Sequence, residues 1–519
     1  MKELNSDVAI VGAGPVGMLL AILLGRAGKA VTVIEKWPEI YDRPRAVTMD
    51  HEVARILATL GIDCDHDADF ENHKELYYWK NADLKDLQIV DWESLAPSLW
   101  HVTYWFNQPR LEARLSEMAE RFPTVRVIRG WTAHALTQDD DGVVLQAVDT
   151  ATGTKRCQLT ARYLVGADGA NSFVRDSLGL AVVDKGYFFD WLILDMVPPP
   201  GFKPSPAQWQ LCDPRRPTTI VPGGPGRRRW EFMVLPTEHK AEIAKPETAW
   251  RLLEPWGITP ENSELERSAV YRFQSRWAQS WVSGRCMIAG DAAHLMPPFA
   301  GEGMCAGLRD AVALSWRLVG LLDGSLRADC LKSYESERLS HARHYIEFSQ
   351  QLGEIICITD PVKAQERDAR MMAELAARDH APITGDLVKL GPGAWCEECD
   401  SGGELSPQGI VSFEGRTDRF DQAVGVGWFV VAVEQDTQGL LTDTQRTRFE
   451  NLGGRVMSLG RDGGGFDIQA RDDAYAAWMA REDTRYFILR PDFYVAATAR
   501  TPDDLSRCFD TVMSRLGVG

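Results

Sequence analysis

The residues that most constrain the fold lie between positions 6 and 35, where a strand, a glycine-rich turn, a helix and a second strand follow one another. Residues 6–11 (SDVAIV) and 31–35 (VTVIE) have the pattern of buried strands, and residues 16–26 continue at helical spacing. The turn between them reads Gly12-Ala-Gly14-Pro-Val-Gly17, and the second strand ends in Glu35. In such a βαβ unit the glycines let a pyrophosphate approach the helix N-terminus, and the acid accepts hydrogen bonds from a ribose. A GxGxxG alone is weak evidence, but this complete context predicts a dinucleotide site rather than a turn that binds nothing.

The same region contains an uncharged run, from Val8 to Gly25, that is long enough to suggest a membrane span or a signal peptide. Three glycines and Pro15 interrupt it, so a buried strand and helix explain it better. The net charge of −17 argues against nucleic acid or an anionic membrane as partner. We therefore expect a soluble, cytoplasmic protein with no nucleic-acid or membrane partner.

At 519 residues the chain is long enough for two or three domains. Strand and helix patterns alternate up to about residue 185. After that the sequence pattern changes to strand-like segments separated by Pro/Gly turns. Strongly helical patterns return after the segment RCMIAGD at 285–291, and a Gly/Pro-rich stretch precedes a compact βαβ-like C-terminal part. The expected boundaries are 1–185 (first part of the α/β domain), 186–275 (antiparallel sheet), 276–384 (return to the first domain and helical region), 385–409 (linker) and 410–519 (C-terminal domain).

Two further glycine-aspartate turns follow predicted strands. The first is Gly166-Ala-Asp168-Gly169. The second is Gly290-Asp291, and after it come a proline pair at 297–298 and Gly301-Glu302-Gly303, where a helix begins. Either turn alone is a common way to end a strand, but their joint presence in this order is more specific.

The three motifs resemble those of single-component FAD-dependent aromatic hydroxylases, and most closely the 3-(3-hydroxyphenyl)propionate hydroxylase type. The resemblance extends over most of the chain, through segments such as DRPRAVTMDHEVARIL, RRRWEFMVLPTE, GDAAHLMP and LRPDFYVAATA. It implies an α/β fold in which a Rossmann-like FAD-binding domain carries an inserted antiparallel-sheet substrate domain and a C-terminal thioredoxin-like domain.

The resemblance also implies an activity, in which NAD(P)H reduces FAD and O2 forms a flavin hydroperoxide that hydroxylates a phenolic aromatic compound, ortho to an existing hydroxyl. No second GxGxxG with strand and helix context is present, so NAD(P)H is expected to bind transiently. Alternatives are an oxidase or reductase on the same scaffold, or a flavin-binding protein without catalysis. A halogenase is less favoured because no Trp-x-Trp-x-Ile-Pro segment occurs.

Within this resemblance Asp291 would contact the ribityl or pyrophosphate part of FAD, and a helix beginning near Gly301 would stabilise negative charge on the reduced ring. Glu302 departs from the usual Gln, and we expect its carboxylate to point away from the ring, where an ionised acid is unfavourable. The expected cofactor-binding residues are Gly12, Gly14, Pro15, Val16, Gly17, Glu35, Lys36, Arg45, Gln108, Asp168, Asp291, Pro298, Gly301, Gly303 and Met304.

Hydroxylation requires a phenol to lose or share its proton, so a base or polar relay is needed. His51, His101 and His294 are candidates, each with a structural role as the alternative; His294 and Pro297, beside the flavin, are the predicted catalytic residues. Trp209, Trp230, Phe232 and Pro297 are the predicted substrate-binding residues, with Trp191 and Met233 as further possibilities, although strand alternation places about half of such residues on the opposite face. Arg215, Arg216 and Arg227–Arg229 could bind a substrate carboxylate or form a solvated turn.

The ten cysteines show no disulfide framework. Cys396-Glu-Glu-Cys399 is a lone CxxC in the Gly/Pro-rich stretch, which is a weak signal for metal or redox chemistry, and no metal is predicted. The C-terminal domain has no CxxC after its first strand, so we expect it to serve structure or dimerisation, and the sequence leaves a homodimer open.

Overall fold

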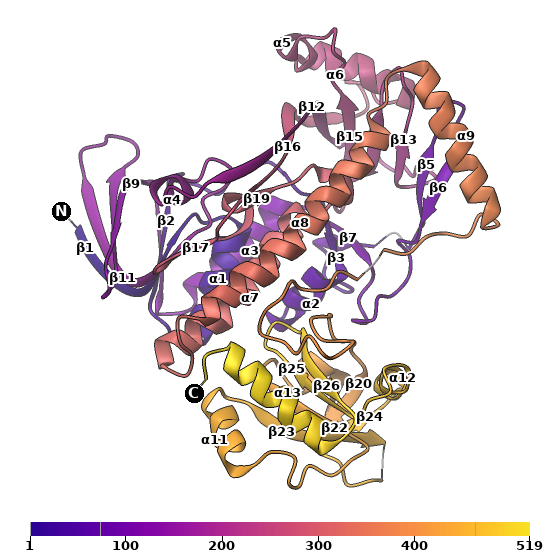
Figure 1. Ribbon diagram of the computed structural model, residues 1–519. Coiled ribbons are helices and arrows are strands. Elements are labelled where there is room, and N and C mark those ends of the chain that lie inside the picture. The colour runs from indigo at the N-terminus through magenta and orange to yellow at the C-terminus, as the bar shows by residue number, and fades with distance from the viewer. Residues whose placement is uncertain (1, 73, 386, 462, 519) are drawn as a thin grey trace.

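The computed structural model describes residues 2–72, 74–385, 387–461 and 463–518. Figure 1 shows two sheets with the long helices α7 (Gly303–Asp323) and α8 (Cys330–Ile356) running across the middle, and the C-terminal domain, in yellow, packed against one side. Among the described residues, no helix is long and apolar enough to cross a membrane.

The first sheet has the strand order β17-β18-β11-β1-β2-β8, and β10 and β9 extend it as a hairpin from β11. Strands β18, β11, β1, β2 and β8 run parallel to one another, and β17 is antiparallel to β18. Helix α1 (Pro15–Arg26) is buried on almost every side and packs against α3 and α7. Because β1, β11 and β18 are parallel, their carboxyl ends bring the three glycine turns to one edge, as expected for a Rossmann-like domain. The strands are β1 (Lys2–Val11), β2 (Val31–Glu35), β8 (Val125–Arg129), β9 (Trp131–Gln138), β10 (Val143–Asp149), β11 (Arg156–Gly166), β17 (Val282–Ser283) and β18 (Cys286–Ile288), and α3 is Gln108–Glu120.

The second sheet has the order β19-β16-β12-β15-β14-β13-β5-β6. Its centre is the antiparallel sheet expected at 186–275, and β5 and β6 join it from residues 77–90 through a parallel pairing of β5 with β13. Helix α9 (Pro361–Ala377) packs against β6 by its apolar face. The bounds are β5 (Tyr77–Lys80), β6 (Asp86–Val90), β12 (Val182–Val197), β13 (Trp209–Leu211), β14 (Thr218–Pro222), β15 (Arg228–Met233), β16 (Glu264–Ala278) and β19 (His294–Leu295), with helices α5 (Lys240–Ile243) and α6 (Pro246–Leu253).

A small sheet, β3-β7-β4, and helices α2 and α4 connect these parts. They comprise β3 (Thr48–Asp50), β4 (Phe70–Glu71), β7 (Thr103–Phe106), α2 (His51–Thr59) and α4 (Phe173–Ser177), and there are 3₁₀ turns at Glu254–Trp256, Gly290–Ala292 and Pro298–Ala300.

The C-terminal domain has a seven-stranded sheet of order β21-β20-β24-β23-β22-β25-β26. Strand β22 is parallel to β23 and antiparallel to β25, and β26 is antiparallel to β25, which is the thioredoxin-like arrangement expected. The elements are β20 (Ile410–Phe413), β21 (Arg416–Arg419), α10 (Phe420–Ala423), β22 (Phe429–Val433), α11 (Asp443–Asn451), β23 (Arg455–Arg461), β24 (Ile468–Ala470), α12 (Ala474–Arg481), β25 (Tyr486–Leu489), β26 (Val495–Ala499) and α13 (Pro502–Arg515).

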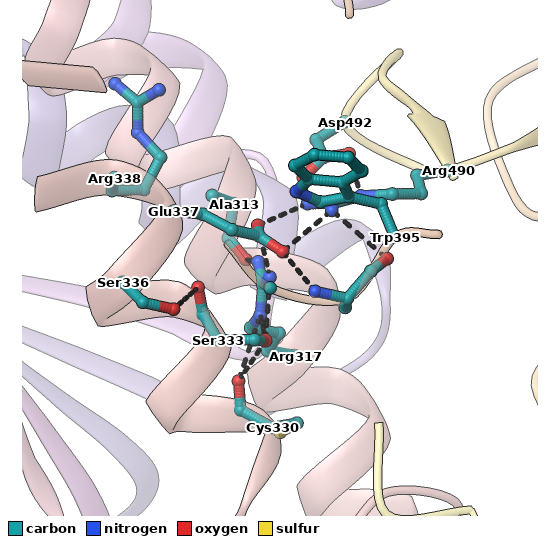
Figure 2. Close-up of polar contacts among 12 residues, drawn as sticks. Ala313, Arg317, Cys330, Ser333, Ser336, Glu337, Arg338, Trp395, Arg490 and Asp492 are labelled. Atoms are coloured by element: carbon teal, nitrogen blue, oxygen red, sulfur yellow. Dashed lines mark hydrogen bonds and ion pairs between the residues drawn. The ribbon is translucent and has the colours of Figure 1, made fainter. Parts of the chain in front are cut away.

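Buried charges hold this domain to the rest of the molecule. The carboxylate of Glu337, on α8, accepts hydrogen bonds from Arg317 (2.7 Å), from both terminal nitrogens of Arg490 (2.9 and 2.7 Å) and from the backbone N–H of Ala394 (2.6 Å). Figure 2 shows how these groups converge from α7, α8, the 385–409 segment and the C-terminal domain. The described part of that segment contains no helix or strand, yet Ala394, Ser401 and Gln408 are buried.

Candidate active site

The turn after β1 has the shape that a dinucleotide requires. Gly12 has φ +106°, and a Cβ on it would lie 2.2 Å from the carbonyl oxygen of Ala167, so no other residue fits. A Cβ on Gly17 would lie 2.1 Å from the carbonyl oxygen of Gly12, which explains the close contact between helix and turn. A Cβ on Gly14 would meet no atom within 4 Å, so this position faces open space. The carboxylate of Glu35 accepts a hydrogen bond from the N–H of Ala13 (2.8 Å) and retains lone pairs for a ribose.

A cavity of about 620 Å³ runs from this turn to the second sheet. It unites all three glycine turns with the start of α7, although they are separated by hundreds of residues in the chain. The lining therefore fits a long cofactor with FAD's combination of pyrophosphate, ribose and ring. Of the predicted cofactor-binding residues, the cavity is lined by Gly12, Gly14, Pro15, Val16, Glu35, Lys36, Arg45, Gln108, Asp168, Asp291, Pro298, Gly301, Gly303 and Met304.

The two aspartates of the later turns differ in their contacts. Asp168 accepts hydrogen bonds from Ser172 Oγ (2.5 Å) and from the N–H of Val174 (3.1 Å), so its carboxylate fixes its own turn. Asp291 is exposed to the cavity; desolvation by the surrounding protein walls raises its pKa, and nearby His294 and Arg45 oppose that shift. Asp291 is thus the better placed of the two to meet a hydroxyl of the cofactor.

The loop that carries Arg45 is held by α3 and by the second sheet. Gln108 Oε1 accepts hydrogen bonds from the N–H groups of Arg45 (3.2 Å) and Ala46 (2.6 Å). From the second sheet, Arg229 donates to the carbonyl oxygens of Arg45 (2.7 Å) and Pro44 (3.2 Å), and it forms an ion pair with Asp195. The loop therefore links the cofactor end of the cavity to β15.

Helix α7 begins at Gly303, at the cavity wall, and Gly301 before it has φ +72°. Glu302 is not part of the cavity lining, because its carboxyl accepts a hydrogen bond from Arg309 (2.9 Å). Arg309 also contacts Asp50 and Glu52. Burial and the neighbouring Asp50 raise the pKa of Glu302 to about 8. The acid thus points away from the cavity, as expected.

At the sheet end the cavity is mostly aromatic, with one polar row. Glu231, Thr219 and Gln210 lie opposite one another on β15, β14 and β13, and Thr219 Oγ1 donates to Gln210 Oε1 (2.6 Å). Burial raises the pKa of Glu231 to about 7, although Arg229 lies 3.7 Å away and opposes the shift. The aromatic lining consists of Tyr77, Trp92, Trp105, Tyr271, Phe273 and Phe299.

Several predicted residues lie elsewhere. Trp209, Trp230 and Phe232 pack in a cluster on the opposite face of the second sheet, and Pro297 is absent from the lining although Pro298 is in it. The alternation of side chains along β15 explains this placement: Arg229, Glu231 and Met233 point one way, and Trp230 and Phe232 the other.

The candidate histidines also lie outside the lining. His294 is buried and its Nε2 hydrogen bonds to Asp310 (2.9 Å), and His51 contacts Ser98 (3.0 Å). His101 contacts the carbonyl oxygen of Glu93 (3.3 Å). Sequence reasoning missed Glu231; the signal that marks it is a single acid within the strand RRWEFM.

Of the candidate arginines, three form ion pairs with nearby acids: Arg215 with Asp213, Arg216 with Glu238 and Arg227 with Glu266. Arg229 alone among the five lines the cavity, where its donors are already engaged by Asp195 and the Arg45 loop.

Comparisons with known proteins agree with this geometry. The FAD binding domain family matches residues 5–349, and the HcaD C-terminal domain family matches residues 403–515. The chain is 34% identical to a probable NADH-specific resorcinol 4-hydroxylase of Rhodococcus jostii, over 96% of this chain and 93% of that one. It is 31% identical to a 3-(3-hydroxy-phenyl)propionate/3-hydroxycinnamic acid hydroxylase of Burkholderia cenocepacia, over 95% and 94% of the two chains. Among solved structures, aklavinone-11 hydroxylase with FAD and aklavinone superposes with a TM-score of 0.77 at 22% identity, covering both chains fully.

The fold and the cavity thus define a flavoprotein monooxygenase. The chain belongs to the FAD binding domain family and, within it, to the aromatic hydroxylases. It uses FAD, NAD(P)H and O2 to hydroxylate a phenolic aromatic compound.

Proposed function

We propose that the substrate is a small, uncharged phenol with a second hydroxyl meta to the first, of the resorcinol type, and that it is hydroxylated ortho to a hydroxyl. The row of Glu231, Thr219 and Gln210 carries the proposal, because it offers hydrogen-bonding groups for hydroxyls within an aromatic cavity. The name of the R. jostii relative points the same way.

A substrate with a propionate group is less favoured by this arrangement. Its carboxylate would share the sheet end of the cavity with Glu231. The arginines at that end, Arg229 and Arg267, already donate to the carbonyl oxygens of the Arg45 loop, and Arg229 pairs with Asp195. Hydroxyl recognition therefore fits these contacts better than carboxylate recognition.

We propose that FAD is held by the predicted residues that line the cavity, with Gly12, Gly14 and Glu35 at its ADP part and with Asp291 nearer the ring. When bound, FAD would accept a hydride from NAD(P)H and, once reduced, would activate O2. The chain's own contribution is to hold the phenol, exclude water through the aromatic lining and take its proton.

Glu231 is the proposed proton acceptor. A pKa of about 7 suits a group that must accept a proton at neutral pH. The proton passes from the phenol oxygen to a carboxylate oxygen of Glu231, and the phenolate that remains is electron-rich at its ortho carbon. Thr219 and Gln210 would orient the second hydroxyl.

The test compares resorcinol with 3-(3-hydroxyphenyl)propionate, following NADH and NADPH oxidation and the product mass. Resorcinol should yield a product heavier by one oxygen, and Glu231→Gln should lower kcat by about 10²–10⁴-fold and abolish the fall in rate below about pH 7. Glu264→Gln, an exposed acid on β16, should behave as the wild type. Preference for the propionate, or an unchanged pH profile in Glu231→Gln, would contradict the proposal. Peroxide formation that is independent of any phenol would instead indicate an oxidase.

We propose further that the enzyme acts in the cytoplasm. All ten cysteines are free thiols, which fits a reducing compartment. Fractionation of the source cells with a specific antibody tests this. A homodimer stays a prediction, to be tested by light scattering.

A further inference from the structure

A cluster of three thiols lies outside the cavity lining, and the activity makes no use of it. Cys396 and Cys399 belong to one turn of the 385–409 segment, and Cys508 lies on α13. The Sγ atom of Cys508 is 3.5 Å from that of Cys396 and 3.6 Å from that of Cys399, and all three lie within 4.8 Å of one another. Cys399 Sγ also lies 3.1 Å from the carbonyl oxygen of Thr498.

These separations match the distance between two thiolate sulfurs that bind the same metal ion. A Zn–S bond of about 2.3 Å in tetrahedral geometry places two sulfur atoms about 3.8 Å apart. A disulfide would draw two of the sulfur atoms to about 2.05 Å and leave the third without a partner. Three sulfur atoms within 4.8 Å of one another therefore fit one soft cation better than one covalent pair.

The backbone holds the sulfur atoms in place. Cys396 donates its N–H to the carbonyl oxygen of Ala496 (2.7 Å), and Cys399 donates its N–H to the carbonyl oxygen of Cys396 (3.1 Å). A Cβ on Gly402 would lie 2.5 Å from the carbonyl oxygen of Cys396, so the turn closes tightly on itself. The turn thus presents both thiols toward α13 in a fixed geometry.

Helix α13 makes further contacts with the same turn next to the thiols. Arg515 donates to the carbonyl oxygens of Trp395 (2.6 Å) and Gly393 (3.1 Å), and it pairs with Glu397 (2.8 Å). Cys508 lies seven residues before Arg515 in the same helix, which is two helical turns, so both residues lie on one side of α13. The position of Cys508 relative to the turn is therefore fixed independently of any ion.

We propose that Cys396, Cys399 and Cys508 bind one zinc ion through three thiolate sulfurs. Cys399 and Cys508 are partly exposed, which leaves the fourth position to water. Binding releases the thiol protons to solvent and forms three Zn–S bonds, with no change of oxidation state. The ion would tie the 385–409 segment to α13, and its role is structural because none of its ligands lines the cavity.

Metal analysis of the full-length, FAD-loaded enzyme tests the proposal. The protein should contain about one zinc per chain, and Cys399→Ser and Cys508→Ser should each reduce this to about one-tenth or less. Cys157→Ser removes a buried thiol on β11, outside the cluster, and should leave the zinc content unchanged. Retention of the visible FAD spectrum in each variant shows that loss of zinc does not result from misfolding.

Cobalt(II) gives a second, spectroscopic measurement. Replacement of zinc should produce thiolate-to-cobalt charge-transfer absorption and the intense visible bands of a tetrahedral site, and Cys508→Ser should lose both. The proposal is overturned if the wild type takes up less than about one-tenth of a zinc or cobalt ion per chain when either metal is supplied. It is equally overturned if the intact mass under non-reducing conditions is lower by two hydrogens, with the disulfide mapped to the cluster.

Discussion

Two buried glutamates, Glu337 between the domains and Glu231 in the cavity, have opposite surroundings. Glu337 accepts hydrogen bonds from Arg317, Arg490 and the backbone of Ala394, and these arginines lower its pKa against the effect of burial. Among the residues that the structure describes, the carboxyl of Glu231 accepts no hydrogen bond, and burial raises its pKa to about 7. The same side chain at similar burial thus becomes a structural anchor where its partners are complete and a proton acceptor where they are not.

Removal of the Glu337 carboxylate is expected to have the largest effect on stability. Glu337→Ala leaves Arg317 and Arg490 buried without their shared partner, so the free energy of unfolding should fall by about 3–5 kcal/mol. Urea unfolding followed by tryptophan fluorescence measures this. Glu347→Ala, which removes an exposed pair with Arg343 on the same helix, should change the stability by less than about 0.5 kcal/mol. Equal effects of the two substitutions would mean that the buried network contributes nothing special.

Ionisation of Glu231 should make the stability of the folded protein depend on pH. The pKa of Glu231 is higher in the folded chain than its ordinary value of 4.5, so folding binds a proton and its effect on stability worsens as pH rises from 4.5 through about 7. Glu231→Gln should therefore be more stable than the wild type by about 3 kcal/mol at pH 8, and the gain should vanish below about pH 4. Thermal unfolding across this range measures it.

Glu337 provides the matched test with the opposite sign. Its pKa is lowered by folding, so its stabilising contribution is complete above its ordinary pKa of 4.5 and is lost as pH falls below that value. Glu337→Gln should therefore be destabilised most at neutral pH, with a difference that shrinks in acid. Parallel pH profiles for the two variants would contradict the comparison.

The smallest effect is expected at Glu302, which lies just outside the cavity lining. Glu302 accepts a hydrogen bond from Arg309 and does not line the cavity, so Glu302→Gln keeps an acceptor for Arg309 and changes nothing that faces the ring. The fraction of NADH oxidation that yields product should change by less than about twofold, which is about 0.4 kcal/mol. A loss of tenfold or more would show that the carboxyl reaches the ring after all.

Local sequence patterns predicted the strand, turn and helix around Gly12 well. The conformation of Gly12, the helix that follows it and the placement of Glu35 are all set within one βαβ unit, where residue pattern and structure are closely tied. Asp291 joins the same cavity from the distant end of β18, and only its resemblance to a family motif indicated this before the structure did.

The sheet end was not predictable in the same way. Every residue of β15 is buried, because one face lines the cavity and the other is covered by the cluster around α6. Burial on both faces therefore hides which face meets the cavity, and Trp230 and Phe232 lie on the face that packs against α6. Similarly, nothing local links Cys508 to Cys399, which lies 109 residues earlier in the chain.

The contacts around Glu337 limit how freely parts can be exchanged between relatives. Among the described residues, the buried pairs that join the part of the chain before residue 385 to the C-terminal domain include three: Arg55 with Asp421, Trp316 with Asp492, and Glu337 with Arg490. A chimera joined within residues 385–409 would separate all three pairs, even though the joint itself falls in a segment without helix or strand. The two parts are separate in the sequence, but their stabilities depend on each other through these buried pairs. A stable hybrid therefore needs both members of each pair from the same parent.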